Sequence, residues 1–200
     1  MINLIQLRKS ALPGDIILTG TNHKFSLGWL IQFGQKIQTP DGKPSKWKHV
    51  LMFVDSTTIA ESTIDFKPYK PTQKRMDNGP QFNYIESIKD EDYAVLLHFK
   101  SLSDEQRNLM LKTAKQIIES GKYRYDITGL IGSLITYWVF RWVKSNPFSG
   151  KYQFYCSAFI SKILKSIDID PDEGHTDRNT SPEMEWQWAT KYEDIEIIWL

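Results

Sequence analysis

The only cysteine in this 200-residue chain, Cys156, lies at the start of a predicted helix. It belongs to the stretch KYQFYCSAFISKIL at residues 151–164, in which the apolar residues after the cysteine follow the 3.6-residue period of a helix. In the first turn of a helix, unpaired backbone N–H groups and the positive end of the helix dipole favour a thiolate and can hold an oxyanion. Cys156 is therefore a candidate nucleophile. The alternative is an inert thiol packed in the core, because cysteine is among the most buried residue types.

A cysteine nucleophile needs a general base, and His49 is the best candidate among the four histidines. It opens the buried run HVLMFV directly after a turn-rich loop, at a sheet edge where a rigid element can position a catalytic side chain. His23 lies in a turn with no orienting partner nearby in sequence. His98 belongs to the strand-like run YAVLLHF, where we expect it to be packed, and His175 lies in a stretch typical of a surface loop.

Such a base also needs a third polar group that fixes its tautomer. Glu61 follows in TIAEST, and only Asp55 and Ser56 separate its run from that of His49, so the two runs are expected to pair as a hairpin. A carboxylate in an apolar strand calls for a partner, since charges are rarely buried unpaired. The alternative is a solvated strand glutamate, because most glutamates are exposed and a one-residue slip in register would turn Glu61 to the other face.

Strand-like patterns dominate the first half of the chain and helical patterns the second, which predicts an α+β organisation. The expected strands lie at 16–19, 49–54, 56–66, 82–88, 93–99 and 194–200. The expected helices lie at 25–37 and 103–120, with two more beginning at 127 and 156.

The helix at 103–120 has the clearest boundary signals. Ser103 and Gln106 have the spacing of a capping box, and Gly121 is expected to end the helix. Its inner face is predicted to consist of five apolar residues, Leu109, Leu111, Ala114, Ile117 and Ile118.

Six segments follow the order expected of the permuted NlpC/P60 (papain-like) superfamily and most closely resemble its YiiX/YaeF-like branch. They are PGDIIL, KHVLMFVD, IAEST, GKYRYDITGLIG, FYCSAFISKIL and TSPEME, from about Pro13 to Glu183. In that group the sheet with the histidine and the third polar residue precedes the cysteine helix. The resemblance thus implies a circularly permuted papain-like α+β fold, with a small antiparallel sheet packed against helices. Only 44 residues follow Cys156, too few for the barrel of the ordinary papain order.

The same resemblance assigns roles to particular residues. It makes Cys156 the nucleophile, His49 the base and Glu61 the orienting group. Asp15, in the turn PGD, matches a structural turn residue of the family rather than a catalyst. Tyr155 either lines the oxyanion region or packs in the core. The insertion at 67–80 and the aromatic stretch YWVFRW depart from the family pattern.

The resemblance implies a cysteine hydrolase that cleaves an amide or ester bond through an acyl-enzyme. The superfamily includes peptidoglycan peptidases, which cut amides in stem peptides, and lipid-directed members that cleave or transfer acyl chains. Both substrate classes stay open, and so does a catalytically silent binding module with the same fold.

Composition narrows the remaining possibilities. The chain has 25 basic and 24 acidic side chains and a formal charge of +1, so there is no net field to recruit nucleic acid. A single cysteine excludes an internal disulfide, and the spacing of cysteine and histidines offers no zinc cluster, so no metal or organic cofactor is expected. The length predicts a single domain over 1–200.

The apolar segment at 127–140 is 14 residues long, short of the roughly 20 needed to span a bilayer. With its extension to Val143 it contains Trp138, Phe140 and Trp142. Three roles stay open for these side chains: an acyl-binding wall, a contact with a membrane surface, or filling of the core under the sheet. The N-terminal residues do not resemble a secretion signal. We therefore expect a protein that is cytoplasmic as synthesised and reaches other compartments by lysis or a dedicated secretion system.

Overall fold

The apolar runs of the sequence form a six-stranded antiparallel sheet in the computed structural model, which describes residues 2–23, 26–63, 78–125, 154–171 and 180–200. The strands are β1 (Ile16–Gly20), β2 (His49–Phe53), β3 (Thr58–Thr63), β4 (Gly79–Tyr84), β5 (Tyr93–Phe99) and β6 (Ile195–Trp199). Their order across the sheet is β4-β3-β2-β1-β5-β6, with every neighbouring pair antiparallel. The predicted α+β organisation is confirmed.

Five helices and three short 3₁₀ turns lie around this sheet in the described part of the chain. The helices are α1 (Leu4–Ser10), α2 (Leu27–Gly34), α3 (Asp104–Glu119), α5 (Cys156–Leu164) and α6 (Pro182–Ala189). The turns are η1 (Gln35–Ile37), η2 (Ile85–Ile88) and η3 (Lys165–Ile167). Helices α1 and α6 were not among the elements predicted from the pattern. The predicted helix from 127 and the aromatic segment at 127–143 lie outside the described residues, as do His175 and most of the insertion at 67–80.

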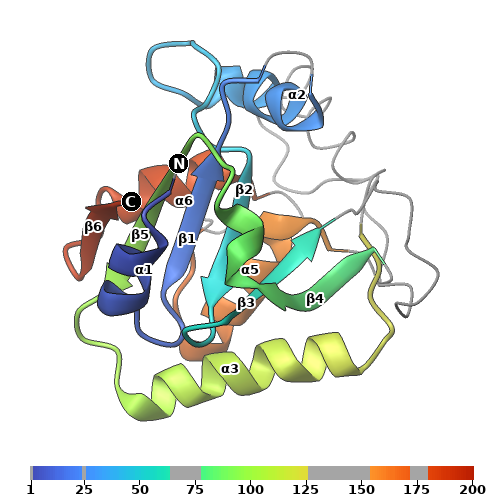
Figure 1. The fold of residues 1–200 in the computed structure, drawn as a ribbon, viewed down its shortest axis with the longest axis vertical. Helices are drawn as coiled ribbons and strands as arrows, with labels where there is room; N and C mark the ends of the chain where they lie inside the picture. Colours follow the sequence, from blue (N-terminus) through green and yellow to red (C-terminus); the bar gives the residue numbers. More distant parts are fainter. Residues whose placement is uncertain (1, 24–25, 64–77, 126–153, 172–179) are drawn as a thin grey trace.

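Both faces of the sheet are buried, which explains the long apolar runs of its central strands. Alternate residues of β1 and β2, such as Leu18 and Met52, pack with Phe159 of α5 in the larger apolar cluster. Their neighbours Ile17 and Leu51 pack in the second cluster on the opposite face, which includes residues of α1. Figure 1 accordingly shows α1 over one face of the sheet and α5 and α6 over the other.

Helix α3 confirms the predicted start and corrects the predicted inner face. Ser103 and Gln106 form the capping box, because each side chain bonds the backbone N–H of the other residue. Leu109, however, is 42% exposed, and its neighbour Met110 is fully buried instead. Arg107, one turn earlier, is also buried, so a charged residue occupies part of the face that the apolar pattern reserved for aliphatic side chains.

The predicted strand at 82–88 extends over two different elements. Strand β4 begins earlier, at Gly79, and ends at Tyr84, after which Ile85–Ile88 form the 3₁₀ turn η2. Ile85 and Ile88 are both buried, since three residues per turn place them on the same side. The apolar spacing therefore reflected burial by a turn rather than continuation of the strand.

Candidate active site

The candidate site lies where strands β2 and β3 separate. Their ladder pairs Met52 with Ala60 and Phe53 with Ile59. His49 lies three residues before Met52, and Glu61 one residue after Ala60, so both occupy the end of the hairpin beyond these pairs. Figure 1 shows the two strands diverging toward this end, with α5 behind them. Because the strands are not paired at this end, a side chain of one strand can contact residues of the other that are not directly opposite it.

His49 and Glu61 meet at this end. The Nε2 atom of His49 lies 2.6 Å from Oε2 of Glu61, and the two side chains are 18% and 6% exposed. The alternative of a solvated strand glutamate is thus wrong. The expected juxtaposition of the two residues is found, although it is diagonal across the strands rather than between opposed positions.

Helix α5 brings Cys156 to the same imidazole. Cys156 is its first residue, is only 2% exposed, and its side chain is hydrogen-bonded to His49. Because Nε2 of the ring bonds Glu61, the ring nitrogen left for Cys156 is Nδ1. The helix is held in place by its apolar side, including Phe159, Ile160 and Ile163, which are fully buried in the core. This is the predicted helix, with the cysteine in its first turn.

The charges of these three side chains support one another. Burial by itself lowers the pKa of His49, but the Cys156 and Glu61 side chains, through their charges and hydrogen bonds, outweigh it and raise that pKa to about 10. Burial likewise raises the pKa of Glu61, yet the hydrogen bond and charge of His49 bring it below its ordinary value. At neutral pH the imidazole therefore carries its proton and donates hydrogen bonds to both neighbours.

Asn83 is also part of this cluster, and its role was not predicted from the sequence. Its Nδ2 atom donates to Oε1 of Glu61 at 2.8 Å, from β4 on the outer side of β3. The hydrogen bond also contributes to the lowered pKa of Glu61. An asparagine in a strand, 22 residues after its partner, carries no local pattern that could have indicated this contact.

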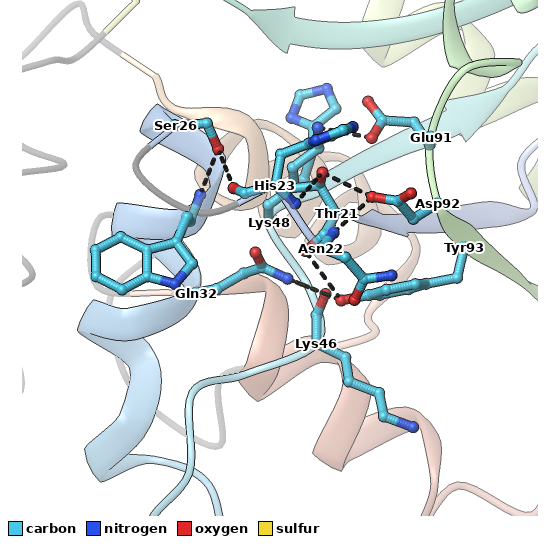
Figure 2. Close-up of polar contacts among 12 residues, drawn as sticks. Thr21, Asn22, His23, Ser26, Gln32, Lys46, Lys48, Glu91, Asp92 and Tyr93 are labelled. Atoms are coloured by element: carbon cyan, nitrogen blue, oxygen red, sulfur yellow. Dashed lines mark hydrogen bonds and ion pairs between the residues drawn. The ribbon is translucent and has the colours of Figure 1, made fainter.

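The segment that leads into His49 is fastened to α2 and β5 (Figure 2). Gln32 of α2 donates through Nε2 to the backbone oxygen of Lys46 at 2.6 Å and to the Tyr93 hydroxyl at 3.0 Å. Lys48, directly before His49, forms an ion pair with Glu91 at 2.6 Å. These contacts fix the backbone on the N-terminal side of the histidine, where β2 has not yet entered the sheet.

The loop after β1 is held at the same end of the sheet. The Asp92 carboxylate accepts hydrogen bonds from the Thr21 hydroxyl at 2.9 Å and from the Asn22 backbone N–H. Figure 2 shows this network beside Lys48 and Tyr93. His23 is exposed, and its backbone N–H bonds the Thr21 hydroxyl, so it belongs to this loop rather than to the cluster around Cys156.

His98 pairs with a different carboxylate. Its Nδ1 atom lies 2.7 Å from Oδ2 of Asp15, a fully buried residue that also accepts from Arg107 at 2.9 Å and from the Leu12 backbone N–H at 2.8 Å. The cluster ties β1 to β5 and α3. It agrees with a structural turn role for Asp15, and it shows that His98 is held by a hydrogen bond to an ion-paired carboxylate rather than by apolar packing alone.

Tyr155 contributes to the core rather than to an open surface. Its side chain is 2% exposed and belongs to the same apolar cluster as Phe159. As the N-cap residue of α5 it makes no side-chain capping bond, within the described chain, to the first-turn N–H groups that begin with Cys156. Its burial agrees with the packing role, and the oxyanion-lining role stays a prediction.

Three observations complete the description of the site. Among the described residues, no group of three or more His, Cys, Asp or Glu side chains could hold a metal ion. No helix in the described ranges is long and apolar enough to cross a bilayer. Comparisons with protein-family models, with curated proteins and with solved structures found no match to this chain.

Proposed function

We propose that this protein is a cysteine hydrolase that cleaves an amide or ester bond through an acyl-enzyme. The observation that carries the proposal is the single imidazole of His49, bonded to a buried carboxylate on one side and to the only thiol of the chain on the other. A thiol is a strong nucleophile only as the thiolate, and a protonated imidazole beside it stabilises that form.

In the acylation step, the Cys156 thiolate attacks the carbonyl carbon and a carbon–sulfur bond forms. The electron pair of the carbonyl moves to its oxygen, and the Cys156 backbone N–H at the start of α5 donates to this oxyanion. The protonated His49 then gives its proton to the leaving amine or alcohol as the bond to it breaks. A thioester and a neutral imidazole result.

In the deacylation step, neutral His49 takes a proton from water, and the resulting hydroxide attacks the thioester carbonyl. Collapse of the tetrahedral intermediate releases the carboxylic acid product and returns Cys156 to the thiolate and His49 to the imidazolium. Glu61 stays ionised through both steps, because it orients the ring and balances its positive charge. If another acceptor replaces water, the same site is an acyltransferase.

The order of the elements supports a permuted papain-like fold, as proposed from the sequence. The strands with His49 and Glu61 precede α5, whereas the ordinary papain order has the cysteine first. The proposed steps are carried by the thiolate, the imidazole and the N-terminus of α5, and none of them uses a cofactor.

The substrate is an acyl amide or ester of one of two classes, a peptidoglycan-type peptide or an acyl lipid. To separate them, purified protein is incubated with muropeptides, with phospholipids and with N-acyl lipids, and the products are identified by mass spectrometry. We expect release from one class, together with a mass increase on Cys156 equal to the bound acyl group. Addition of hydroxylamine should remove that group, as it does from a thioester.

Cys156→Ala and His49→Ala provide the controls. Both should retain the thermal unfolding transition and lose product formation, since each removes one member of the reacting pair. A His49→Ala protein that turns over substrate as fast as the wild type would exclude His49 as the base. Binding of a substrate without release by the wild-type protein would instead favour the silent binding module.

A further inference from the structure

Strand β4 supplies one more residue to the proposed catalytic cluster. Resting on the proposed function, we propose that Asn83 is a positioning residue that holds the Glu61 carboxylate in the orientation and the ionised form that His49 requires. Asn83 acts through Glu61 and His49, and it does not contact the reacting atoms.

The orientation of the Asn83 amide is fixed by its own backbone. Its Oδ1 atom accepts a hydrogen bond from the Tyr84 backbone N–H at 2.8 Å. The amide nitrogen must therefore be the atom that faces Glu61, where it donates to Oε1 at 2.8 Å. If the amide were flipped, both hydrogen bonds would be lost and its oxygen would face Oε1 of Glu61.

The two carboxylate oxygens of Glu61 have separate partners. Oε1 accepts from Asn83 on β4, and Oε2 accepts from His49 on β2. A carboxylate held at both oxygens by donors on opposite sides cannot rotate without losing one of them. Asn83 thus fixes the plane in which Glu61 presents its second oxygen to the imidazole.

The lengths of the two ladders explain why this support comes from β4. Strands β3 and β4 are in register over six pairs, from Thr58↔Tyr84 to Thr63↔Gly79, whereas the β2–β3 ladder pairs Met52 and Phe53 only. Glu61 is therefore anchored to β4 much more firmly than to β2. Asn83 lies opposite Ile59, two residues before Glu61, and so shares its face of the sheet.

The hydrogen bond from Asn83 also affects the ionisation of Glu61. Among the described residues, the ionisable group that faces Glu61 is His49 from β2, which in turn faces Cys156 from α5, while β4 contributes the neutral amide of Asn83. Burial raises the pKa of Glu61, and the bonds from His49 and Asn83 counteract it. Without Asn83, the carboxylate would take up a proton at a higher pH and would no longer balance the imidazolium.

Gln81 offers a matched control on the same strand. It is the residue directly opposite Glu61 in the β3–β4 ladder, and it is half-buried like Asn83. It has the same amide group and lies two residues away on the same face. The hydrogen bond to Glu61 nevertheless comes from Asn83. A general weakening of β4 would affect both positions, whereas loss of a positioning residue would affect Asn83 alone.

The test follows alkylation of Cys156 by iodoacetamide as a function of pH from about 3.5 to 8, with intact mass as the readout. Because the chain has one cysteine, each labelled molecule reports on this site. The variants are Asn83→Ala, the isosteric Asn83→Asp, Gln81→Ala and His49→Ala, each checked by its thermal transition at pH 7. The isosteric variant keeps the volume and tests the inference if the alanine variant does not fold.

We expect the acid-side loss of labelling to move to higher pH by about one unit in Asn83→Ala, the scale of one hydrogen bond to a carboxylate. The movement should be at least as large in Asn83→Asp, because two neighbouring carboxylates cannot both ionise easily. Gln81→Ala should match the wild type. Profiles of folded Asn83 variants that superimpose on the wild type would overturn this inference alone. Equal labelling of His49→Ala and wild type would overturn the proposed function, and this inference with it.

Discussion

Glu61 accepts a hydrogen bond from His49 at 2.6 Å although the two residues lie beyond the paired part of the β2–β3 ladder. The carboxylate and the imidazole thus replace backbone pairing as the link between the strands at this end. Because the same imidazole is bonded to Cys156, the state of Glu61 controls the charge beside the thiol.

Glu61→Gln tests this relationship with little change in volume. The amide keeps a hydrogen-bonding group near His49 but removes the negative charge that favours the imidazolium. A charge-assisted hydrogen bond is worth about 1.5–3 kcal/mol, so we expect the rate of Cys156 alkylation at pH 7 to fall roughly tenfold to a hundredfold. Labelling of the folded variant at the wild-type rate would contradict the proposed effect of Glu61 on Cys156 through His49.

The pH dependence of turnover reports on His49 itself. Its pKa is raised to about 10, so the imidazolium that protonates the leaving group persists through neutral pH and is lost only as the pH rises through about 10. We expect kcat/KM, measured with the substrate identified above, to decline on the alkaline side near pH 10. A decline near pH 6.5, the ordinary pKa of a histidine, would show that Cys156 and Glu61 do not hold the ring in its protonated form.

The stability of the fold at low pH depends on the ionisation of Glu61. Its pKa in the folded protein is lowered, so its contribution to stability is present above the ordinary value of 4.5 and is lost as the pH falls through the lowered pKa. Thermal unfolding at pH 7 and pH 3 should therefore show a larger loss in the wild type than in Glu61→Gln, which has no such group to protonate. Equal losses would contradict the lowered pKa.

Arg107→Met should destabilise the fold without involving the catalytic cluster. The change leaves the fully buried Asp15 with His98 as its remaining ionisable partner, and breaking a buried pair in this way costs about 3 kcal/mol. Urea unfolding measures the loss. The control is Lys115→Met, which breaks an exposed pair with Glu119 at 3.7 Å and should change the free energy of unfolding by less than about 0.5 kcal/mol. Similar losses in the two variants would argue against a structural role for the Asp15 cluster.

Gly20→Ala should disturb the segment that leads into His49. A Cβ atom at this position would lie 2.0 Å from the Lys46 backbone oxygen and 2.1 Å from the Tyr93 ring, so backbone must move. Overpacking of this kind costs about 1–3 kcal/mol, and we expect a lower thermal midpoint together with slower alkylation of Cys156. Gly28→Ala is the milder comparison, because its nearest contact is the Lys48 side chain at 2.6 Å rather than backbone. An unchanged midpoint in Gly20→Ala would show that the segment has room to shift.

Most elements of the fold could be predicted from local sequence patterns. Short continuous apolar runs predicted β1, β2 and β5, and the period of 3.6 predicted α3 and α5, because both signals are contained within a few residues of chain. The same local reasoning missed α1 and α6, which are only seven and eight residues long. It also assigned Leu109 rather than Met110 to the core, since one residue is a rotation of about 100° on a helix.

The residue types available for chemistry, and the elements that carry them, could be predicted from the amino-acid sequence: a cysteine that begins a helix, a histidine that opens a strand and a glutamate on the next strand. The contact among these three residues, and the hydrogen bond to the glutamate from Asn83 rather than Gln81, became visible in the folded chain. The same is true of the contact between His98 and Asp15. The physical reason is that register, strand divergence and the position of α5 arise from burial shared among residues far apart in the chain, which no single stretch of sequence encodes.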